Sequence, residues 1–321
     1  MRNLLKTVAA TLLAAFALSA AAQDYPSRPL RLIVPFAPGG GADIVARAIA
    51  GPLARRLGQP VVVENKPGGG ATLGADIVAK APADGYTLLY ATPGPQITNP
   101  YLMGKLPYDP EKDLVPVSQV AIVPSVLVVH KDVPVRTVKE LIQYAKAHPG
   151  KLNFASAGLG ATSHLAGELF KQAAGVDLVH VPYRGTGAAL ADLLSGQVQM
   201  AIDSIAVYKP HIDAGSLRAI GVSSLERSAL LPGVPPIADD LKGFEGSPIN
   251  YVAVRGGTPQ PLIDRLNRDL NAVLQAAETK EQLISNGVIP KGGTPAQMAA
   301  LIRSEAAKWK RVIEVSGARI E

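Results

Sequence analysis

The chain has 321 residues, of which 47% are hydrophobic and 18% charged, with 31 glycines, 27 prolines and no cysteine. Such a composition is typical of a folded globular protein with many tight turns, and it excludes disulfide bonds and lipid attachment through cysteine. The formal charge of +6 is interleaved with acidic residues, so the basic stripe of a nucleic-acid-binding protein is missing.

The N-terminus has the pattern of a secretory signal. Arg2 and Lys6 precede an apolar stretch at 8–18, and Ala20-Ala21-Ala22 supplies the small residues of a cleavage site. We therefore predict a signal peptide over 1–22, whose removal takes two positive charges from +6 and leaves +4. No apolar stretch reaches the roughly 20 residues of a membrane span. We expect the mature chain to lie free in the periplasm, without membrane insertion.

Two series of apolar runs alternating with helical patterns follow the signal. The first extends from 30 to 92 and the second from 151 to 224. Strands that are continuous Val, Ile and Leu runs, separated by helices of about 10–15 residues, indicate parallel sheets covered on both faces. The fold class predicted by this pattern is α/β, with two lobes.

Val-rich stretches at 120–132 and 247–257 lack helical periodicity and are predicted to be two strands that cross between the lobes. This prediction assigns 23–124 and 250–321 to the first lobe and 125–249 to the second.

The tail carries two further helical patterns. Each opens with Thr-Pro, at Thr258-Pro259 and Thr294-Pro295, where the threonine would cap the helix and the proline would occupy its first turn. Trp309 lies on the apolar stripe of the second helix and is expected to be core packing.

Three glycine-containing turns, at 36–43, 156–163 and 184–188, each lead from a strand into a helix. Parallel strands place such turns at the carboxyl edge of their sheet, where ligands bind in open α/β folds. A helix N-terminus presents unpaired N–H groups and a partial positive charge, so it suits a carboxylate. Ser156 and Thr186 add hydroxyl donors, and Thr162 or Ser163 is expected to cap its own helix.

Other chemistries fit these turns less well. The glycine pattern at 158–163 lacks the third glycine of a dinucleotide fingerprint, and no P-loop motif exists. Phe154 replaces the first glycine of a nucleophile elbow, and adjacent Ser163 and His164 would point about 100° apart on a helix. The histidines lack zinc-site spacing, and His180 is expected to be a simple buried strand residue.

Motifs along the whole mature chain resemble the Bug family, the periplasmic solute receptors of tripartite tricarboxylate transporters. The motifs are "YPSRPLRLIVPFAPGGGADIVAR", "LGQPVVVENKPGGG", "DGYTLLYAT", "PGKLNFASAG", "HLAGELF", "VHVPYRGTGAALADLLSGQV", "HIDAGSLRAIGVSS" and "KWKRVIEVSGA". The resemblance implies a two-lobed periplasmic binding protein fold, type II-like, that closes on a small carboxylic acid. It implies a non-enzymatic monomer without cofactor or metal, whose transient partners are membrane transporter subunits.

In that family the loop matching Phe36 to Gly41 and the turn matching Ser156 to Gly158 hold one ligand carboxylate, partly through waters. Thr92 and Asp203 match further cleft positions; Asp203 would orient a water, meet a ligand hydroxyl or amine, or serve only as a capping or hinge residue. The ligand-binding residues expected from the turns and the resemblance are Phe36, Ala37, Gly39, Gly40, Gly41, Thr92, Ser156, Ala157, Gly158, Thr162, Ser163, Thr186, Gly187, Asp203 and Tyr251.

Two segments depart from the family pattern. Pro93 and Pro95 stiffen the loop after "TLLYAT", and Asn250-Tyr251 replaces a common Trp or Phe on the return strand. Both segments could line the distal pocket, so citrate, a C4-dicarboxylate, an amino acid, nicotinate and a benzoate-type acid all stay open as ligands. Two alternative functions also stay open: presentation of a ligand to a sensor kinase, and hydrolysis by Ser156.

Overall fold

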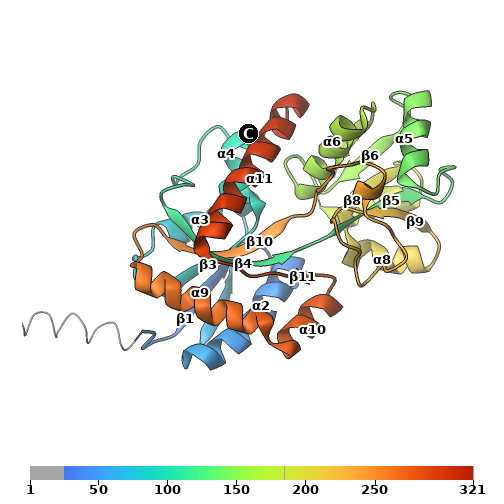
Figure 1. The fold of residues 1–321 in the computed structure, drawn as a ribbon. Coiled ribbons are helices and arrows are strands. Elements are labelled where there is room, and N and C mark those ends of the chain that lie inside the picture. The colour runs from blue at the N-terminus through green and yellow to red at the C-terminus, as the bar shows by residue number, and fades with distance from the viewer. Residues whose placement is uncertain (1–24, 184, 321) are drawn as a thin grey trace, which may run out of the picture.

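The computed structural model describes residues 25–183 and 185–320, which form two α/β lobes joined by extended segments (Figure 1). The first lobe contains a six-stranded sheet in the order β11-β4-β10-β3-β1-β2, and the second a five-stranded sheet in the order β7-β6-β8-β5-β9. The predicted α/β class with two lobes is confirmed. The predicted signal peptide lies outside the described residues.

The chain builds the lobes in the order first, second, first. The first lobe begins with β1 (Leu30–Val34), α2 (Gly41–Leu57), β2 (Val61–Asn65), η1 (Gly69–Ala71), α3 (Thr72–Ala79), β3 (Thr87–Ala91), η2 (Gly94–Thr98), α4 (Asn99–Leu102) and β4 (Leu114–Ile122). The second lobe contains β5 (Ser125–His130), α5 (Val138–Ala147), β6 (Asn153–Ser156), α6 (Thr162–Ala174), β7 (Val179–Pro182), α7 (Thr186–Leu194), β8 (Met200–Ser204), α8 (Ile205–Asp213), β9 (Leu217–Val222) and η3 (Ile237–Asp239). The first lobe is completed by β10 (Ile249–Arg255), α9 (Gln260–Gln275), α10 (Ala277–Ser285), β11 (Ile289–Pro290) and α11 (Pro295–Ser316).

Both sheets are mixed, which corrects the prediction of parallel sheets. β1 pairs in parallel with β2 and β3, and β6 pairs in parallel with β7 and β8. In contrast, β10 is antiparallel to β3 and β4, and β5 is antiparallel to β8 and β9. A run of apolar residues indicates that a strand is buried, but it does not indicate whether the strand is parallel or antiparallel to its neighbours.

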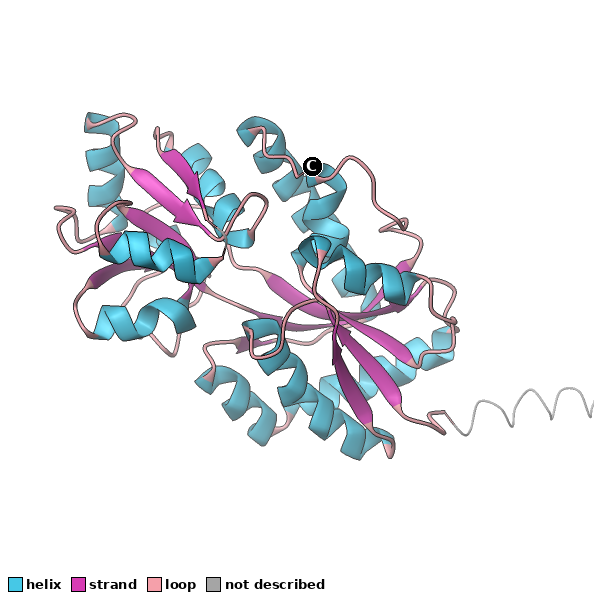
Figure 2. Cartoon of the chain, turned by 180° about the vertical axis from the view of Figure 1, so that it is seen from behind, coloured by secondary structure: helices cyan, strands magenta, loops and turns pink. Residues whose placement is uncertain are grey.

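The chain crosses between the lobes twice, as predicted, but the crossings are connections between strands and not continuous strands. Only residues 123 and 124 separate β4 in the first sheet from β5 in the second, and the chain returns through 223–248 to β10. The Ser223 hydroxyl accepts a hydrogen bond from the Ser125 N–H at 2.8 Å and lies 2.8 Å from the Ser247 hydroxyl. These buried serines therefore tie the outgoing and returning segments together. Figure 2 shows the extended segments that join the two lobes.

Helix α11 belongs to the first lobe but also packs on the second. Trp309 is 4% exposed and shares an apolar cluster with Leu165 of α6, as expected of a core residue. Gln172 Nε2, also on α6, donates to the Val312 carbonyl at 3.0 Å. The second lobe is thus held against the first by apolar contacts beside the crossings as well as by the crossings themselves.

The two Thr-Pro sequences differ in outcome. Thr294 caps α11 in a capping box, accepting from the Gln297 N–H at 3.1 Å while Gln297 Oε1 accepts from the Thr294 N–H at 2.8 Å. The cap predicted at Thr258 is wrong, because α9 begins two residues later and the Thr258 hydroxyl donates to the Arg255 carbonyl instead.

Replacement of Thr294 by alanine should remove one cap bond of α11 and destabilise the protein by about 1 kcal/mol. Thr294→Ser retains a hydroxyl and is the matched control, expected within about 0.5 kcal/mol of wild type. Urea unfolding followed by circular dichroism measures both, and equal stability of the two variants would contradict the capping box.

Candidate functional site

The predicted glycine turns lie at two sheet edges that face each other. In the first sheet the carboxyl ends of β1, β2 and β3 share one edge with the start of β10, where the chain arrives from the second lobe. In the second sheet the carboxyl ends of β6, β7 and β8 share an edge with the start of β5, where the chain arrives from the first lobe. Both edges therefore border the crossings, which is where ligands bind in open α/β folds.

The first-lobe loop at 36–40 is held by polar side chains beneath it. Gly39 has φ 79°, a conformation that favours glycine, and its N–H donates to Asp43 Oδ2 at 2.9 Å. Asn65 Nδ2 donates to the Phe36 carbonyl at 3.0 Å and to Asp43 Oδ1 at 2.9 Å. The exposed glycines therefore sit on a fixed support.

Asp43 is the electrostatic centre of this support. The hydrogen bond from Arg47 lowers the pKa of Asp43 most, those from Gly39 and Asn65 also lower it, and burial opposes them, leaving a pKa of about 2. Asp43 and Asn65 were not among the residues predicted from the sequence. The signal that would have identified Asp43 is an acidic residue in the first turn of a helix that follows a glycine turn.

The N-terminus of α2 is open. Gly40 caps the helix without a side-chain hydrogen bond, and Gly41 is the first helical residue. Among the described residues, the N–H groups of Gly41, Ala42 and Asp43 have no acceptor, and both Gly41 and Ala37 are exposed. This end of α2 can donate several hydrogen bonds to an anion.

The second-lobe loop uses several of its N–H groups internally. The Ala157 N–H donates to Ser163 Oγ at 3.0 Å, and the Gly158 N–H donates to Ser156 Oγ at 3.2 Å. The predicted self-capping by Thr162 or Ser163 is wrong, because Ala161 is the N-cap of α6 and no side chain caps it. Within 25–183 and 185–320, the N–H groups of Thr162, Ser163 and His164 are left without an acceptor.

Two histidines lie directly beneath this loop. His180 Nε2 is 2.6 Å from Ser156 Oγ, and its ring stacks on those of His164 and Phe154, with centroids 3.9 and 4.8 Å apart. His164 Nδ1 accepts from the Gly160 N–H at 3.0 Å. His180 is thus half-buried and paired, not the simple core residue that its strand pattern suggested.

The Ser156–His180 contact has the length of a nucleophile–base pair, but its surroundings differ from those of a catalytic triad. Ser156 is 1% exposed, and among the described residues no carboxylate is hydrogen-bonded to His180. Burial lowers the pKa of His180 to about 4, helped by His164 and Lys171. The described residues around His180 therefore lack the carboxylate that, in a triad, orients the histidine base and stabilises its charged form.

Two predicted residues of the second lobe, Thr186 and Ser163, contribute hydrogen bonds to the carboxylate of a third, Asp203. Thr186 Oγ1 donates to Asp203 Oδ2 at 2.8 Å, and the Ser204 N–H donates to Asp203 Oδ1 at 2.8 Å. Burial raises the pKa of Asp203, while hydrogen bonds from Thr186, Ser204 and the Ser163 hydroxyl oppose the rise. The neighbouring Gly187 is exposed at the start of α7.

The remaining predicted residues have different outcomes. Thr92 follows β3 at the facing edge and is half-buried. Tyr251 is 0% exposed, and its hydroxyl donates to Gln96 Oε1 at 3.0 Å inside the first lobe. Asn250 and Tyr251, which were expected to line the distal pocket, lie on β10, an inner strand, and both side chains are buried. Asn250 Nδ2 instead donates to the Tyr90 hydroxyl at 2.8 Å.

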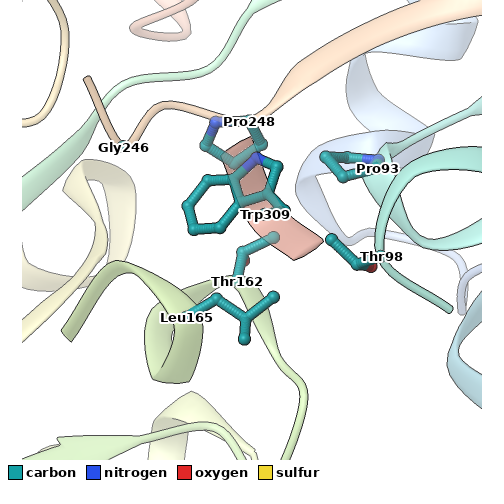
Figure 3. Close-up of a pocket in the computed structure, with 7 residues that line it drawn as sticks. All are labelled: Pro93, Thr98, Thr162, Leu165, Gly246, Pro248 and Trp309. Atoms are coloured by element: carbon teal, nitrogen blue, oxygen red, sulfur yellow. The ribbon is translucent and has the colours of Figure 1, made fainter. Parts of the chain in front are cut away.

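A small pocket lies where α6 meets the first lobe (Figure 3). Trp309 forms one wall, with Pro248 and Leu165 on either side of its ring. The complete lining is Pro93, Thr98, Thr162, Leu165, Gly246, Pro248 and Trp309. Thr162 also begins α6, so the mainly apolar pocket adjoins the open N-terminus of that helix.

Two kinds of feature are not found in the described ranges. No three His, Cys, Asp or Glu side chains in 25–183 and 185–320 are grouped so that they could hold a metal ion. Over the same residues, no helix combines the length and apolar character needed to cross a membrane.

The chain matches the family model described as "Tripartite tricarboxylate transporter family receptor" over residues 45–318. It is 43% identical over 291 residues to the "UPF0065 protein in tcbD-tcbE intergenic region" of Pseudomonas sp. (strain P51), covering 90% of this chain and 86% of that protein. It is 39% identical over 310 residues to Protein BugT of Bordetella pertussis, covering 96% and 95%.

Solved structures show the same architecture. R. palustris Rpa4515 with adipate has a TM-score of 0.80 and 37% identity, with 92% of this chain and 100% of that chain covered. MatC (Rpa3494) from Rhodopseudomonas palustris with bound malate has a TM-score of 0.75 and 34% identity, with 90% and 100% covered. The two-lobed fold is therefore that of periplasmic solute-binding proteins.

Asp43→Asn should destabilise the protein by about 1–2 kcal/mol at pH 7, because the native pKa of about 2 lies below the ordinary 3.8. A depressed native pKa gives stabilisation that is complete above about pH 4 and is lost as the pH falls toward 2. The stability difference between wild type and variant, measured by urea unfolding, should therefore shrink over that range.

Asp213→Asn is the matched control, since Asp213 also pairs with a cation four residues away on a helix but is 57% exposed. It should cost less than about 0.5 kcal/mol at any pH. An equal cost for both substitutions would mean that Asp43 does not support the loop.

Proposed function

Because this chain belongs to the tripartite tricarboxylate transporter receptor family of periplasmic solute-binding proteins, we propose that it captures a small carboxylic acid between its lobes and delivers it to a tripartite-type membrane transporter. The observation that carries the proposal is the pair of open helix N-termini, α2 and α6, at facing sheet edges. Adipate and malate, named with the two similar structures, belong to this ligand class.

The strength of binding requires both lobes. A micromolar receptor needs about −8 kcal/mol, and each charge-assisted hydrogen bond contributes roughly 1.5–3 kcal/mol. Four or five such bonds supply this before the entropic cost of association. Each of the two helix ends offers three N–H groups without an acceptor in the described chain, so neither end suffices alone. Binding should consequently stabilise a closed form, with the crossings as the hinge.

The pocket at Trp309 holds only about 10 Å³, so in this form it cannot take the body of a ligand. Pro93, Leu165 and Trp309 nevertheless present hydrocarbon beside the N-terminus of α6, which would suit a methylene chain or a ring better than a hydroxyl where a ligand extends toward them. Within 25–183 and 185–320 the hydrogen bonds to Asp203 come from Thr186, Ser204 and Ser163, all uncharged. Asp203 would orient a water or accept from a ligand hydroxyl or amine, and would repel a second carboxylate placed beside it.

The cellular setting follows from the same proposal. The signal peptide over 1–22 would send the chain to the periplasm, where the receptor would act as a monomer and meet the transporter subunits transiently. Lobe boundaries at 23–124, 125–249 and 250–321 are supported by sheet membership, since β5 to β9 all lie in the second sheet. No metal or cofactor takes part in this mode of binding.

A carboxylic-acid panel tests the ligand class. Thermal-shift measurements with adipate, malate, citrate, nicotinate, benzoate and aspartate should show stabilisation by at least one acid, and adipate should stabilise more than malate because of the apolar pocket wall. Stabilisation should be unchanged after dialysis against EDTA. A requirement for a divalent ion, or no response to any acid, would contradict the proposal.

Proline substitutions at the first helical positions test the two-lobe clamp. Gly41→Pro and Thr162→Pro each remove one unpaired N–H, and proline is well accepted there because the preceding residues, Gly40 and Ala161, are extended. Each variant should bind the best panel ligand at least tenfold more weakly, with a melting temperature near that of wild type.

Gly41→Ala and Thr162→Ser are the matched controls, since they keep the N–H and Thr162→Ser also keeps the hydroxyl. They should bind within about threefold of wild type, as a Cβ at Gly41 meets no atom within 4 Å. If either proline variant binds as tightly as its control, that helix end does not hold the carboxylate. Isothermal titration calorimetry gives the affinities.

A further inference from the structure

The second-lobe loop at 156–160 is hydrogen-bonded at both ends by two stacked imidazoles. His180 contacts Ser156, the last residue of β6, at 2.6 Å, and His164 accepts from the N–H of Gly160 at 3.0 Å. The two rings are nearly parallel, at 12° with centroids 3.9 Å apart, so they act as one unit between β7 and α6. Phe154 closes the stack from the β6 side.

We propose that His164 and His180, in their neutral forms, are positioning residues that hold the 156–160 loop in the shape needed for the ligand, and that protonation of His164 releases the loop. This inference rests on the proposed function, because the loop matters only if a ligand is bound beside it.

Hydrogen-bond geometry fixes the proton on the His164 ring. The Gly160 N–H can only donate, so His164 Nδ1 must be an acceptor and its proton lies on Nε2. Protonation of Nδ1 would place two N–H groups against each other at the same 3.0 Å, and the bond would be lost. His164 is therefore the sensitive member of the pair.

Protonation of His180 would disturb its hydrogen bond to Ser156 less. The Gly158 N–H donates to Ser156 Oγ, which leaves the Ser156 hydroxyl proton free to point at His180 Nε2. If His180 took up a proton, the bond would reverse, and the hydroxyl would turn to the Gly158 carbonyl at 3.2 Å. The Ser156 contact can survive this change, whereas the Gly160 contact of His164 cannot.

The surroundings keep both rings neutral at ordinary pH. Burial, followed by the charge of Lys171, lowers the pKa of His164 to about 4, and burial and His164 do the same for His180. Lys171 of α6 is paired with Glu168 at 3.1 Å, and Asp203 of β8 lies behind the Ser163 hydroxyl. In both histidines the native pKa is below the ordinary 6.5. The stabilisation that comes from the hydrogen bonds of the neutral rings to the 156–160 loop is therefore complete above pH 6.5 and is lost as the pH falls through about 4.

Four variants distinguish the effect of the hydrogen bond from the effects of the imidazole charge and ring. His164→Asn keeps an acceptor at the Nδ1 position without a titrating group, and His164→Leu removes the acceptor. His180→Gln and His180→Leu make the same comparison at Nε2. Circular dichroism and thermal unfolding report whether each variant folds, and only variants with a wild-type spectrum enter the comparison.

Nuclear magnetic resonance of the ligand-free protein tests the clamp directly. The Gly160 amide signal should shift with a midpoint near pH 4 in wild type and should not titrate in His164→Asn, and the imidazole ¹⁵N shifts should show His164 protonated on Nε2. A proton on Nδ1, or a Gly160 signal that follows the same pH curve in both proteins, would overturn the proposal.

Affinity for adipate at pH 7.5 tests the link to the ligand. His164→Leu should weaken binding at least fivefold and His164→Asn less than twofold, and the His180 pair should show the same order. Equal loss in the leucine and amide variants would overturn the positioning role. If wild type does not bind adipate, that result counts against the proposed ligand class alone, and the Gly160 titration then decides the clamp.

Discussion

The double crossing of the chain between its two sheets is the constraint on which the other features depend. With β4 leading straight into β5, and β10 returning beside β4, the carboxyl edges of both sheets must border the same junction. The hydrogen bonds among Ser125, Ser223 and Ser247 keep the two passages together at that point. Glycine turns at these edges consequently face the opposite lobe, so the proposed interlobe ligand site follows from the topology.

The two lobes prepare their helix ends in different ways. In the first lobe an ionised carboxylate, Asp43, supports the loop from below and leaves the first N–H groups of α2 open. In the second lobe the support is neutral and consists of the hydroxyls of Ser156 and Ser163 together with the imidazoles of His164 and His180. A neutral support beside the proposed anion site avoids the repulsion that a second buried carboxylate would add. Asp203 is the exception in this lobe, since it is a carboxylate whose oxygens accept from Thr186 and Ser204 and whose pKa is raised by burial.

Sequence reasoning succeeded for part of what is local. Strand–turn–helix order, the glycine at 39 and the threonine cap at Thr294 depend on neighbours within a few residues, and the structure has all three. The caps expected at Thr258 and at Thr162 or Ser163 are equally local and are not formed. Sequence reasoning also failed where partners are distant. Ser156 and His180 are 24 residues apart, and they meet only because β6 and β7 are parallel neighbours. The family resemblance placed Tyr251 at the distal pocket, and the sequence could not reveal that its side chain is buried inside the first lobe.

By itself, the sequence determined the class of protein: an α/β chain of two lobes, with glycine turns that lead into helix N-termini and motifs of a solute-receptor family, because periodicity and turn chemistry are written in consecutive residues. Tertiary structure decided the direction of the strands and the burial of Tyr251. It also decided the support of the 36–40 loop by Asp43 and Asn65, and the contacts of His164 and His180 with the 156–160 loop. Each of these depends on which strands become neighbours, and long-range pairing is selected by the packing of the whole chain and not by any local segment.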